Sequence, residues 1–188
     1  SEENEDPKNK AKDFILSYLI SENNIKIYEF NRLIKDLNGL SKADFLEKLE
    51  VHFTIKNHEE HPFKPIQKHQ FGMYLDQQFY SLVLKKEQVH FDNAHDALDA
   101  QILYDKVLLP ILNIVDLRND ERIEYISGKQ PIQDLKQKID DQEFEVGFLL
   151  FPSNINEIKA LADHDLIMPP KSTYIEPKFR SGLVIYEL

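Results

Sequence analysis

The densest group of anion-binding side chains lies near the end of the chain, in a loop whose backbone is restricted by proline. A Met-Pro-Pro sequence at 168–170 precedes Lys171, Ser172 and Thr173, and Lys178 follows a third proline. Proline fixes φ and lowers the entropy that a loop loses on ordering, so its polar side chains can be held in place. A lysine beside hydroxyl groups suits a phosphate or a carboxylate. The sequence therefore predicts an anion-binding loop with these four side chains as contacts.

The same loop has a simpler interpretation. Ser172 and Thr173 would cap nearby backbone groups while Lys171 faces water. A nucleotide-binding P-loop is not predicted, because the glycines that let a backbone wrap a phosphate are absent and proline precedes the lysine. Residues 169–182 carry three basic side chains against one acid, although the whole chain has a net charge of -10. A positive spot on an acidic chain attracts small anions, so both interpretations stay open.

Two further cations, Arg118 and Arg122, lie among alternating acids in the segment 116–122. They can clamp an anion together, since a guanidinium matches the geometry of an oxyanion. They can also form an ion-pair lattice with the neighbouring acids. The acids lie so close in sequence that the lattice is the favoured interpretation, and the clamp remains the alternative.

Potential metal ligands gather between residues 90 and 99. His95 and Asp99 would share a helix face at a spacing of four if a helix began early. A stable site needs three or four convergent ligands, and only local spacing supports one here. We predict no metal site, and interpret this segment as a solvated loop with Asp99 near a helix start. His58, His61 and His69, in a polar insert, are interpreted as surface side chains.

The composition restricts the function classes. A net charge of -10 disfavours general nucleic-acid binding, because binding to the phosphate backbone needs clustered basic residues. The absence of cysteine excludes disulfides and thiolate metal sites. No apolar run approaches the roughly twenty residues that span a bilayer. No signal peptide is recognised either, so we expect a cytoplasmic protein that does not interact with membranes.

The elements that must position these side chains alternate between strands and helices. Strand patterns cover residues 14–20, 25–33, 51–55, 71–75, 79–84, 122–126, 146–151 and 183–185. Helical patterns begin at Ser41, span 97–109, follow residue 131 through Ile139 and span 155–163. Hairpins occur and strict βαβ repetition does not, which predicts an α+β fold with a mixed or largely antiparallel sheet and helices mainly on one face. Residues 1–10 are predicted to be disordered, and 11–188 to form one domain.

Several motifs in the chain occur in the order expected of a known family. The most specific are in the tail, at 168–174, 176–178 and 180–183; others are Phe30-Asn-Arg32, 37–40, 73–76, 98–103, 110–112, 116–118 and 151–152. Together they resemble the family called domain of unknown function 1015. Whole members of that family have a first half that ends in an Asp-Gly-His-His-Arg motif and is similar to ParB-like and free-serine-kinase domains. This chain lacks that motif and is identified as the C-terminal half of a longer protein.

The resemblance implies a role in serine or phosphoserine metabolism. It implies that ATP or ADP with Mg²⁺ would be bound in the full-length protein, that the N-terminal half is a partner, and that this half alone is inactive. On this hypothesis Lys171, Ser172, Thr173 and Lys178 bind an anionic group of a small metabolite, and Arg118 and Arg122 neutralise developing charge. The alternative is a noncatalytic structural domain that packs against the first half or forms a homodimer.

Overall fold

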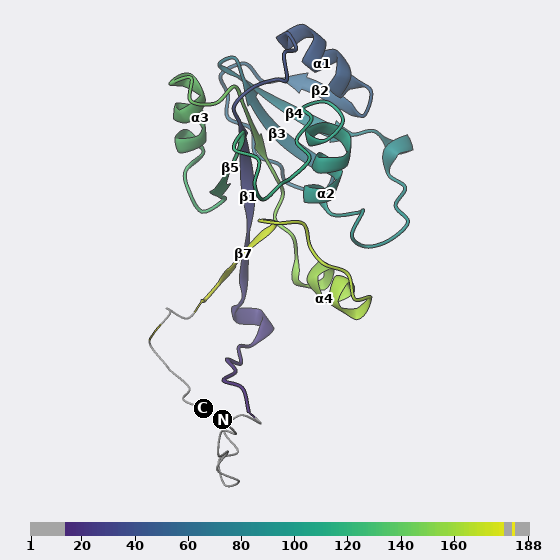
Figure 1. Cartoon of the computed structure of the whole chain (residues 1–188), viewed down its shortest axis with the longest axis vertical. Coiled ribbons are helices and arrows are strands. Elements are labelled where there is room, and N and C mark those ends of the chain that lie inside the picture. The colour runs from purple at the N-terminus through teal and green to yellow at the C-terminus, as the bar shows by residue number, and fades with distance from the viewer. Residues whose placement is uncertain (1–13, 179–181, 183–188) are drawn as a thin grey trace, which may run out of the picture. The chain divides into compact units, whose positions relative to one another are not determined.

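The computed structural model of the protein describes residues 14–178 and residue 182 (Figure 1). The chain divides into two compact units. One consists of residues 27–174, and the other combines 1–26 with 175–188. Among its described residues the second unit contains a short 3₁₀ helix, η2 (Glu22–Asn24). The tail strand expected at 183–185 and the disorder expected over 1–10 lie outside the described residues.

The strand predicted over residues 14–20 is wrong, because this segment has no regular structure. Its apolar side chains are largely exposed, with Phe14 at 64%, Ile15 at 86% and Leu19 at 91%. A pattern of β-favouring residues makes a strand only when a neighbouring strand accepts its backbone hydrogen bonds and its side chains pack on a core. Neither condition is met here within the described part of the chain.

The remaining strands form one seven-stranded sheet in the order β2-β4-β3-β6-β1-β5, with β7 paired to β1. Their bounds are β1 Lys26–Ile34, β2 Phe53–Asn57, β3 Gln70–Leu75, β4 Gln78–Leu84, β5 Ile123–Ser127, β6 Val146–Leu149 and β7 Thr173–Glu176. The pairings along the path from β2 to β5 are antiparallel. The α+β fold is therefore confirmed. β7 was not predicted, because proline and charge dominate the composition of the tail.

Within the described residues, four α-helices connect the strands: α1 Lys42–Glu50, α2 Asp99–Leu103, α3 Ile132–Asp140 and α4 Ile155–Asp163. A further 3₁₀ helix, η3, covers Lys86–Gln88. Ser41 caps the start of α1, because its hydroxyl accepts the Asp44 backbone N–H, and α4 begins with a capping box between Asn154 and Glu157. The helix expected over 97–109 forms, but it widens into a π-helix, η4 (Tyr104–Leu108).

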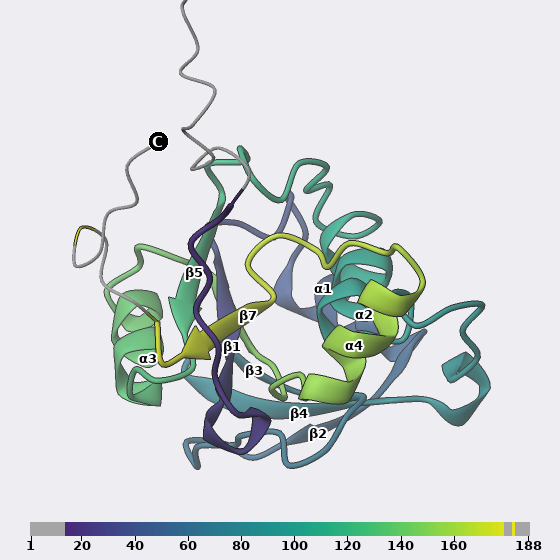
Figure 2. The ribbon, with the colours of Figure 1, turned by 90° about the horizontal axis from the view of Figure 1, so that it is seen from below.

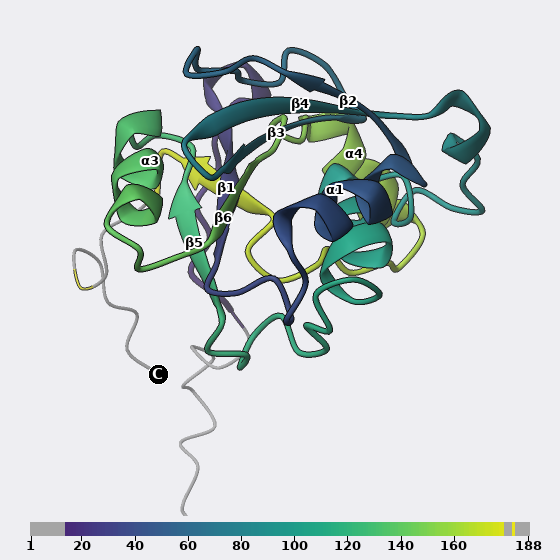
Figure 3. The same cartoon turned by 90° about the horizontal axis from the view of Figure 1, so that it is seen from above.

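Side chains that alternate along the strands form two cores, one on each face of the sheet. On β1, Ile34 belongs to the core beneath α1 and α2, and Leu33 belongs to the core beneath α3. Figures 2 and 3 show α3 on the opposite side of the sheet from α1 and α2. A Cβ at Gly147 would lie 2.7 Å from the Leu135 side chain, so glycine is what lets α3 approach the sheet. With α1 and α2 on one face and α3 on the other, helices lie mainly on one face, as predicted.

Candidate functional site

A buried arginine occupies the middle of the sheet. Arg32 of β1 is only 1% exposed and lies opposite Tyr125 of β5 and Phe148 of β6 in the strand register. Its guanidinium carbon is 5.5 Å from the centre of the Tyr125 ring. Arginine is almost never fully buried unless an acid pairs with it. Its presence on a core face therefore needs an explanation.

Arg32 is incompletely hydrogen-bonded. Nη1 donates to the carbonyl of Phe30 two residues before it, and Nη2 reaches the Lys171 carbonyl at 3.4 Å. Within the described residues Nε is buried with no partner, and no carboxylate forms an ion pair with the guanidinium. Burial lowers the pKa of Arg32 to about 10, and this effect is partly opposed by Tyr125. The side chain remains charged at neutral pH, and no acid among the described residues compensates this charge.

Further cations gather on aromatic rings beside Arg32. Tyr28 and Phe30 precede Arg32 at a spacing of two on β1, and the Tyr174 ring of β7 lies 6.4 Å from Tyr28 and 6.2 Å from Phe30. The Lys129 ammonium is 5.6 Å from the Tyr28 ring and 5.7 Å from the Tyr174 ring. The Lys171 ammonium is 5.6 Å from the Phe30 ring. We call Tyr28, Phe30, Tyr174, Lys129 and Lys171 the cation–aromatic cluster.

The four predicted contacts of the anion-binding loop lie in different environments. Lys171 is exposed, adopts a φ of 51° and belongs to the cation–aromatic cluster. Ser172 is 7% exposed, and its hydroxyl donates to the Pro169 carbonyl at 2.6 Å, which is the backbone-capping alternative. Thr173 is half-buried at the start of β7. Lys178 is exposed and belongs to the other unit.

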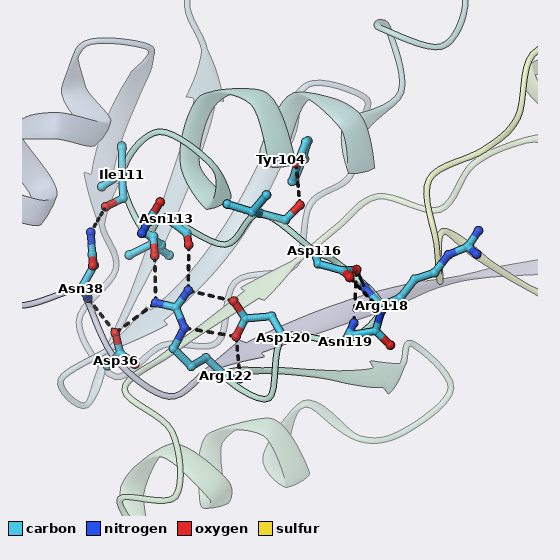
Figure 4. Close-up of polar contacts among 12 residues, drawn as sticks. Asp36, Asn38, Tyr104, Ile111, Asn113, Asp116, Arg118, Asn119, Asp120 and Arg122 are labelled. Carbon is cyan, nitrogen blue, oxygen red and sulfur yellow. Dashed lines mark hydrogen bonds and ion pairs between the residues drawn. The ribbon is translucent and has the colours of Figure 1, made fainter.

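Arg122 adopts the ion-pair lattice rather than an open clamp (Figure 4). Its Nε donates to Asp120 Oδ1 at 3.1 Å and its Nη2 to Asp120 Oδ2 at 2.8 Å. The same guanidinium donates to the carbonyls of Leu112 and Asn113, and Asp36 lies 3.7 Å away. These hydrogen bonds hold the pKa of Asp120 below its usual value. The cation is therefore fully used in joining β5 to the loop after η4.

Arg118 points away from this lattice in Figure 4. Its backbone N–H is bonded to Asp116, while its exposed side chain lines a hollow of about 390 Å³ together with Met168, Pro169 and Pro170. The structure thus brings Arg118 to the proline loop and separates it from Arg122. The two arginines do not converge on one anion.

Asp99 lies at a helix start, as predicted, but it is buried, and His69, predicted to be a surface side chain, is half-buried. Asp99, the first residue of α2, is 6% exposed, and its Oδ1 accepts the His69 backbone N–H at 2.9 Å. Asp99 Oδ2 and His69 Nε2 are both buried without a partner in the described part of the chain. Burial raises the pKa of Asp99 to about 7 and lowers the pKa of His69. Beside them Lys68 pairs with Glu157 of α4.

Among the described residues, His69 and Asp99 do not form part of a metal-binding cluster. In residues 14–178, no group of three or more histidine and acidic side chains is arranged to hold a metal ion. His95, which would share a helix face with Asp99 at a spacing of four, instead lies with its Nδ1 3.2 Å from Oδ1 of its neighbour Asp96. Of the helices in the described residues, none is long and apolar enough to cross a membrane.

A family model described as a protein of unknown function (DUF1015) matches residues 1–101, just over half of the chain. The chain belongs to the DUF1015 family. The resemblance inferred from its motifs is thereby confirmed. The matched region includes β1 with Tyr28, Phe30 and Arg32, and it ends before the proline loop and Lys171.

Solved structures similar to this DUF1015 chain include a free serine kinase in complex with AMP, with 15% identity and a TM-score of 0.46 over 81% of this chain. Another is a conserved hypothetical protein from Pyrococcus furiosus, with 13% identity and a TM-score of 0.46 over 81% of this chain. The alignments cover 54% and 56% of those two chains, so this chain spans little more than half of their length. No curated protein matches the sequence.

Sequence reasoning missed Arg32 as a functional candidate, although the motif Phe30-Asn-Arg32 contributed to the family resemblance. A signal was present, because a single arginine interrupts the alternating apolar pattern of the strand 25–33. On a half-buried strand, that position faces the core whenever its neighbours two residues away do. The pattern alone did not show whether an acid on another strand would lie opposite it.

Proposed function

We propose that this chain is the anion-binding half of a kinase-like protein that acts on a small hydroxyl-bearing or phosphorylated metabolite. Serine and phosphoserine are the candidates that the family resemblance implies. One observation carries the proposal. In a chain of net charge -10, three basic side chains lie over aromatic rings of paired strands. Arg32 lies over Tyr125 of β5, Lys129 over Tyr28 of β1 and Tyr174 of β7, and Lys171 over Phe30 of β1.

The physical argument is that gathered cations repel one another, and that repulsion is stronger where protein excludes water. An anion that binds among them removes the repulsion and gains attraction to each one. Half-buried aromatic rings lower the local polarity and hold the lysines through cation–π contacts. Lys171, over the Phe30 ring, therefore serves as the outer contact for the anionic group, while Lys129 lies over the neighbouring Tyr28 and Tyr174 rings.

ATP or ADP with Mg²⁺ belongs, on this proposal, to the full-length protein. The described part of this chain has no group of metal ligands that would hold Mg²⁺. Its own contribution is to bind and orient the anionic end of the metabolite. We therefore expect the chain by itself to bind ligand without turning it over.

The test is isothermal titration calorimetry of the chain with phosphoserine and with inorganic phosphate at low salt. We expect Lys171→Ala and Lys129→Ala each to weaken binding by about tenfold, since a charge-assisted contact contributes about 1.5 kcal/mol. Lys48→Ala, on the exposed face of α1, removes the same charge elsewhere and is the matched control. Failure of wild-type chain to bind either anion at millimolar concentration would overturn the proposal.

A second candidate function is a noncatalytic structural or dimerisation domain. The Ser172 hydroxyl favours it, because that group is used to brace the proline loop through the Pro169 carbonyl. In that case Lys171→Ala would alter the melting temperature or the molar mass in light scattering, and it would leave calorimetric titrations unchanged. The same variant therefore separates the two functions.

A further inference from the structure

We propose that the Nε–Nη2 edge of Arg32 is a buried oxyanion site that takes two oxygens of one carboxylate or phosphoryl group of the ligand. Within the described chain, Arg32 is the cation that has a buried donor without a partner, and the adjacent Nη2 makes only a long contact. The inference rests on the proposed function, because it names the inner contact of the same ligand. Lys171 and Lys129 remain the outer contacts.

The geometry of the guanidinium supports this assignment. Nη1 is taken by the Phe30 carbonyl. The opposite edge consists of Nε, which has no partner among the described residues, and Nη2, whose contact with the Lys171 carbonyl is long at 3.4 Å. These two groups present parallel N–H bonds that match the two oxygens of a carboxylate or phosphoryl group. The unfilled edge is therefore the one with the bidentate geometry.

The neighbouring polar groups make hydrogen bonds elsewhere, and none of those in the described residues accepts from Nε. The Tyr125 hydroxyl donates to the Leu117 carbonyl at 2.7 Å. The Asn31 Oδ1 accepts the Leu150 backbone N–H at 3.1 Å. A buried donor without an acceptor and a buried charge without a counter-charge are both unfavourable. One bound oxyanion removes both defects together.

The entry point is set by the Lys171 carbonyl. Arg32 is 1% exposed, so an anionic group reaches it only by replacing this carbonyl at Nη2. A contact of 3.4 Å is at the outer limit of a hydrogen bond and is readily exchanged for a charged acceptor. Lys171 carries both the displaced carbonyl and an exposed ammonium group. The loop would thus move as the anion binds, and its side chain would stay at the entrance.

A purely structural role for Arg32 is the competing explanation, in which it only tethers the proline loop to β1. Such a tether needs only Nη2, which reaches the Lys171 carbonyl, and it leaves Nε without a function. It also leaves the charge uncompensated in the sheet. The two explanations differ in what Nε does when anion is added, and this can be observed directly.

The first measurement is NMR of the arginine Nε–H groups in the ¹⁵N-labelled wild-type chain, titrated with inorganic phosphate, phosphoserine and acetate. We expect the Arg32 Nε–H resonance to move downfield and its exchange with water to slow at least tenfold on saturation. A response to acetate as well as phosphate assigns a general oxyanion site, and a response to the phosphate probes alone assigns a phosphoryl site. Anion binding seen by calorimetry with an unmoved Arg32 signal overturns the inference.

The second measurement is binding by Arg32→Lys, which keeps the charge and removes the fork. We expect its affinity for phosphoserine to fall at least tenfold, with Arg122→Lys in the ion-pair lattice as the matched control that binds as wild type does. If Arg32→Lys does not fold, the NMR titration of wild type still decides. Binding that Lys171→Ala weakens and Arg32→Lys leaves intact overturns this inference and spares the proposed function. An absence of anion binding by wild type overturns both.

Discussion

Arg32 in the sheet and Asp99 at the start of α2 are two ionisable side chains in comparable surroundings. Arg32 is 1% exposed and Asp99 is 6% exposed. Each has a polar atom that is buried without a partner among the described residues, Nε in one and Oδ2 in the other. Their responses to burial differ. Arg32 retains its charge with a pKa lowered to about 10, while the pKa of Asp99 rises to about 7.

The difference arises from the pKa that each group has before it is buried. A guanidinium begins so far above neutral pH that burial cannot discharge it. A carboxyl group begins only a few units below neutral pH, so it can take up a proton and become a neutral donor. A buried arginine without an acid is therefore the place where the proposed oxyanion would bind. A buried aspartate whose pKa is raised by burial makes stability depend on pH instead.

The largest expected effect is that of Asp99→Asn on the pH dependence of stability. The pKa of Asp99 is raised from 3.8 to about 7, so the unfolded chain loses this proton at lower pH than the folded chain. The contribution of Asp99 to the free energy of unfolding therefore falls as pH rises from about 4 to about 7. The amide that replaces the carboxyl group keeps the oxygen that accepts the His69 N–H and cannot ionise. We expect the variant to gain about 4 kcal/mol over wild type at pH 8 relative to pH 4.

Urea unfolding of both proteins at pH 4, 6 and 8 measures this gain. Asp163→Asn, at the exposed end of α4, is the matched control and should show no such trend. A constant difference between Asp99→Asn and wild type across this range would show that Asp99 is ionised in the folded chain. The contrast with Arg32 would then disappear.

The next largest effect is the loss of stability in Arg122→Met, which tests the arginine that is paired with an acid. Arg122→Met removes the hydrogen bonds to Asp120, Leu112 and Asn113. Because the side chain is 29% exposed and water can partly replace these contacts, we expect a loss of about 2 kcal/mol in the free energy of unfolding. Thermal and urea unfolding measure it. Raised salt should reduce the difference in the free energy of unfolding between the variant and wild type. An unchanged free energy of unfolding in the variant would mean that the ion-pair lattice does not contribute to stability.

The smallest expected effect is that of Arg32→Met, which should raise the free energy of unfolding rather than lower it. Arg32→Met removes a buried charge whose pKa is lowered to about 10, and it leaves the carbonyls of Phe30 and Lys171 without this donor. The first change is favourable by about 3 kcal/mol and the second unfavourable by about 1 kcal/mol for each carbonyl. We expect the free energy of unfolding, measured by urea unfolding in anion-free buffer, to rise by about 1 kcal/mol. A loss of several kcal/mol would show that the charge is compensated in the folded chain.

Features encoded locally were predicted from the sequence. The hairpin of β3 and β4 was placed correctly, because apolar alternation flanks the Asp76-Gln77 turn, whose residues adopt φ of 48° and 59°. The Arg122 lattice was the favoured interpretation because Asp120 is two residues away. The strand predicted over residues 14–20 is wrong because strand formation is not encoded locally. The composition of this segment favours a strand, and strand formation depends on a pairing partner elsewhere in the chain.

The sequence by itself determined the α+β fold, the family, the absence of thiol chemistry and the clustering of cations near the proline loop. Only the tertiary structure decided which arginine lacks an acid. The contacts of Arg32 come from Tyr125 and Lys171, which are distant along the chain and meet it through strand pairing and loop packing. A missing partner is a property of all the surfaces that surround a side chain. It becomes visible only when the whole sheet has assembled around that position.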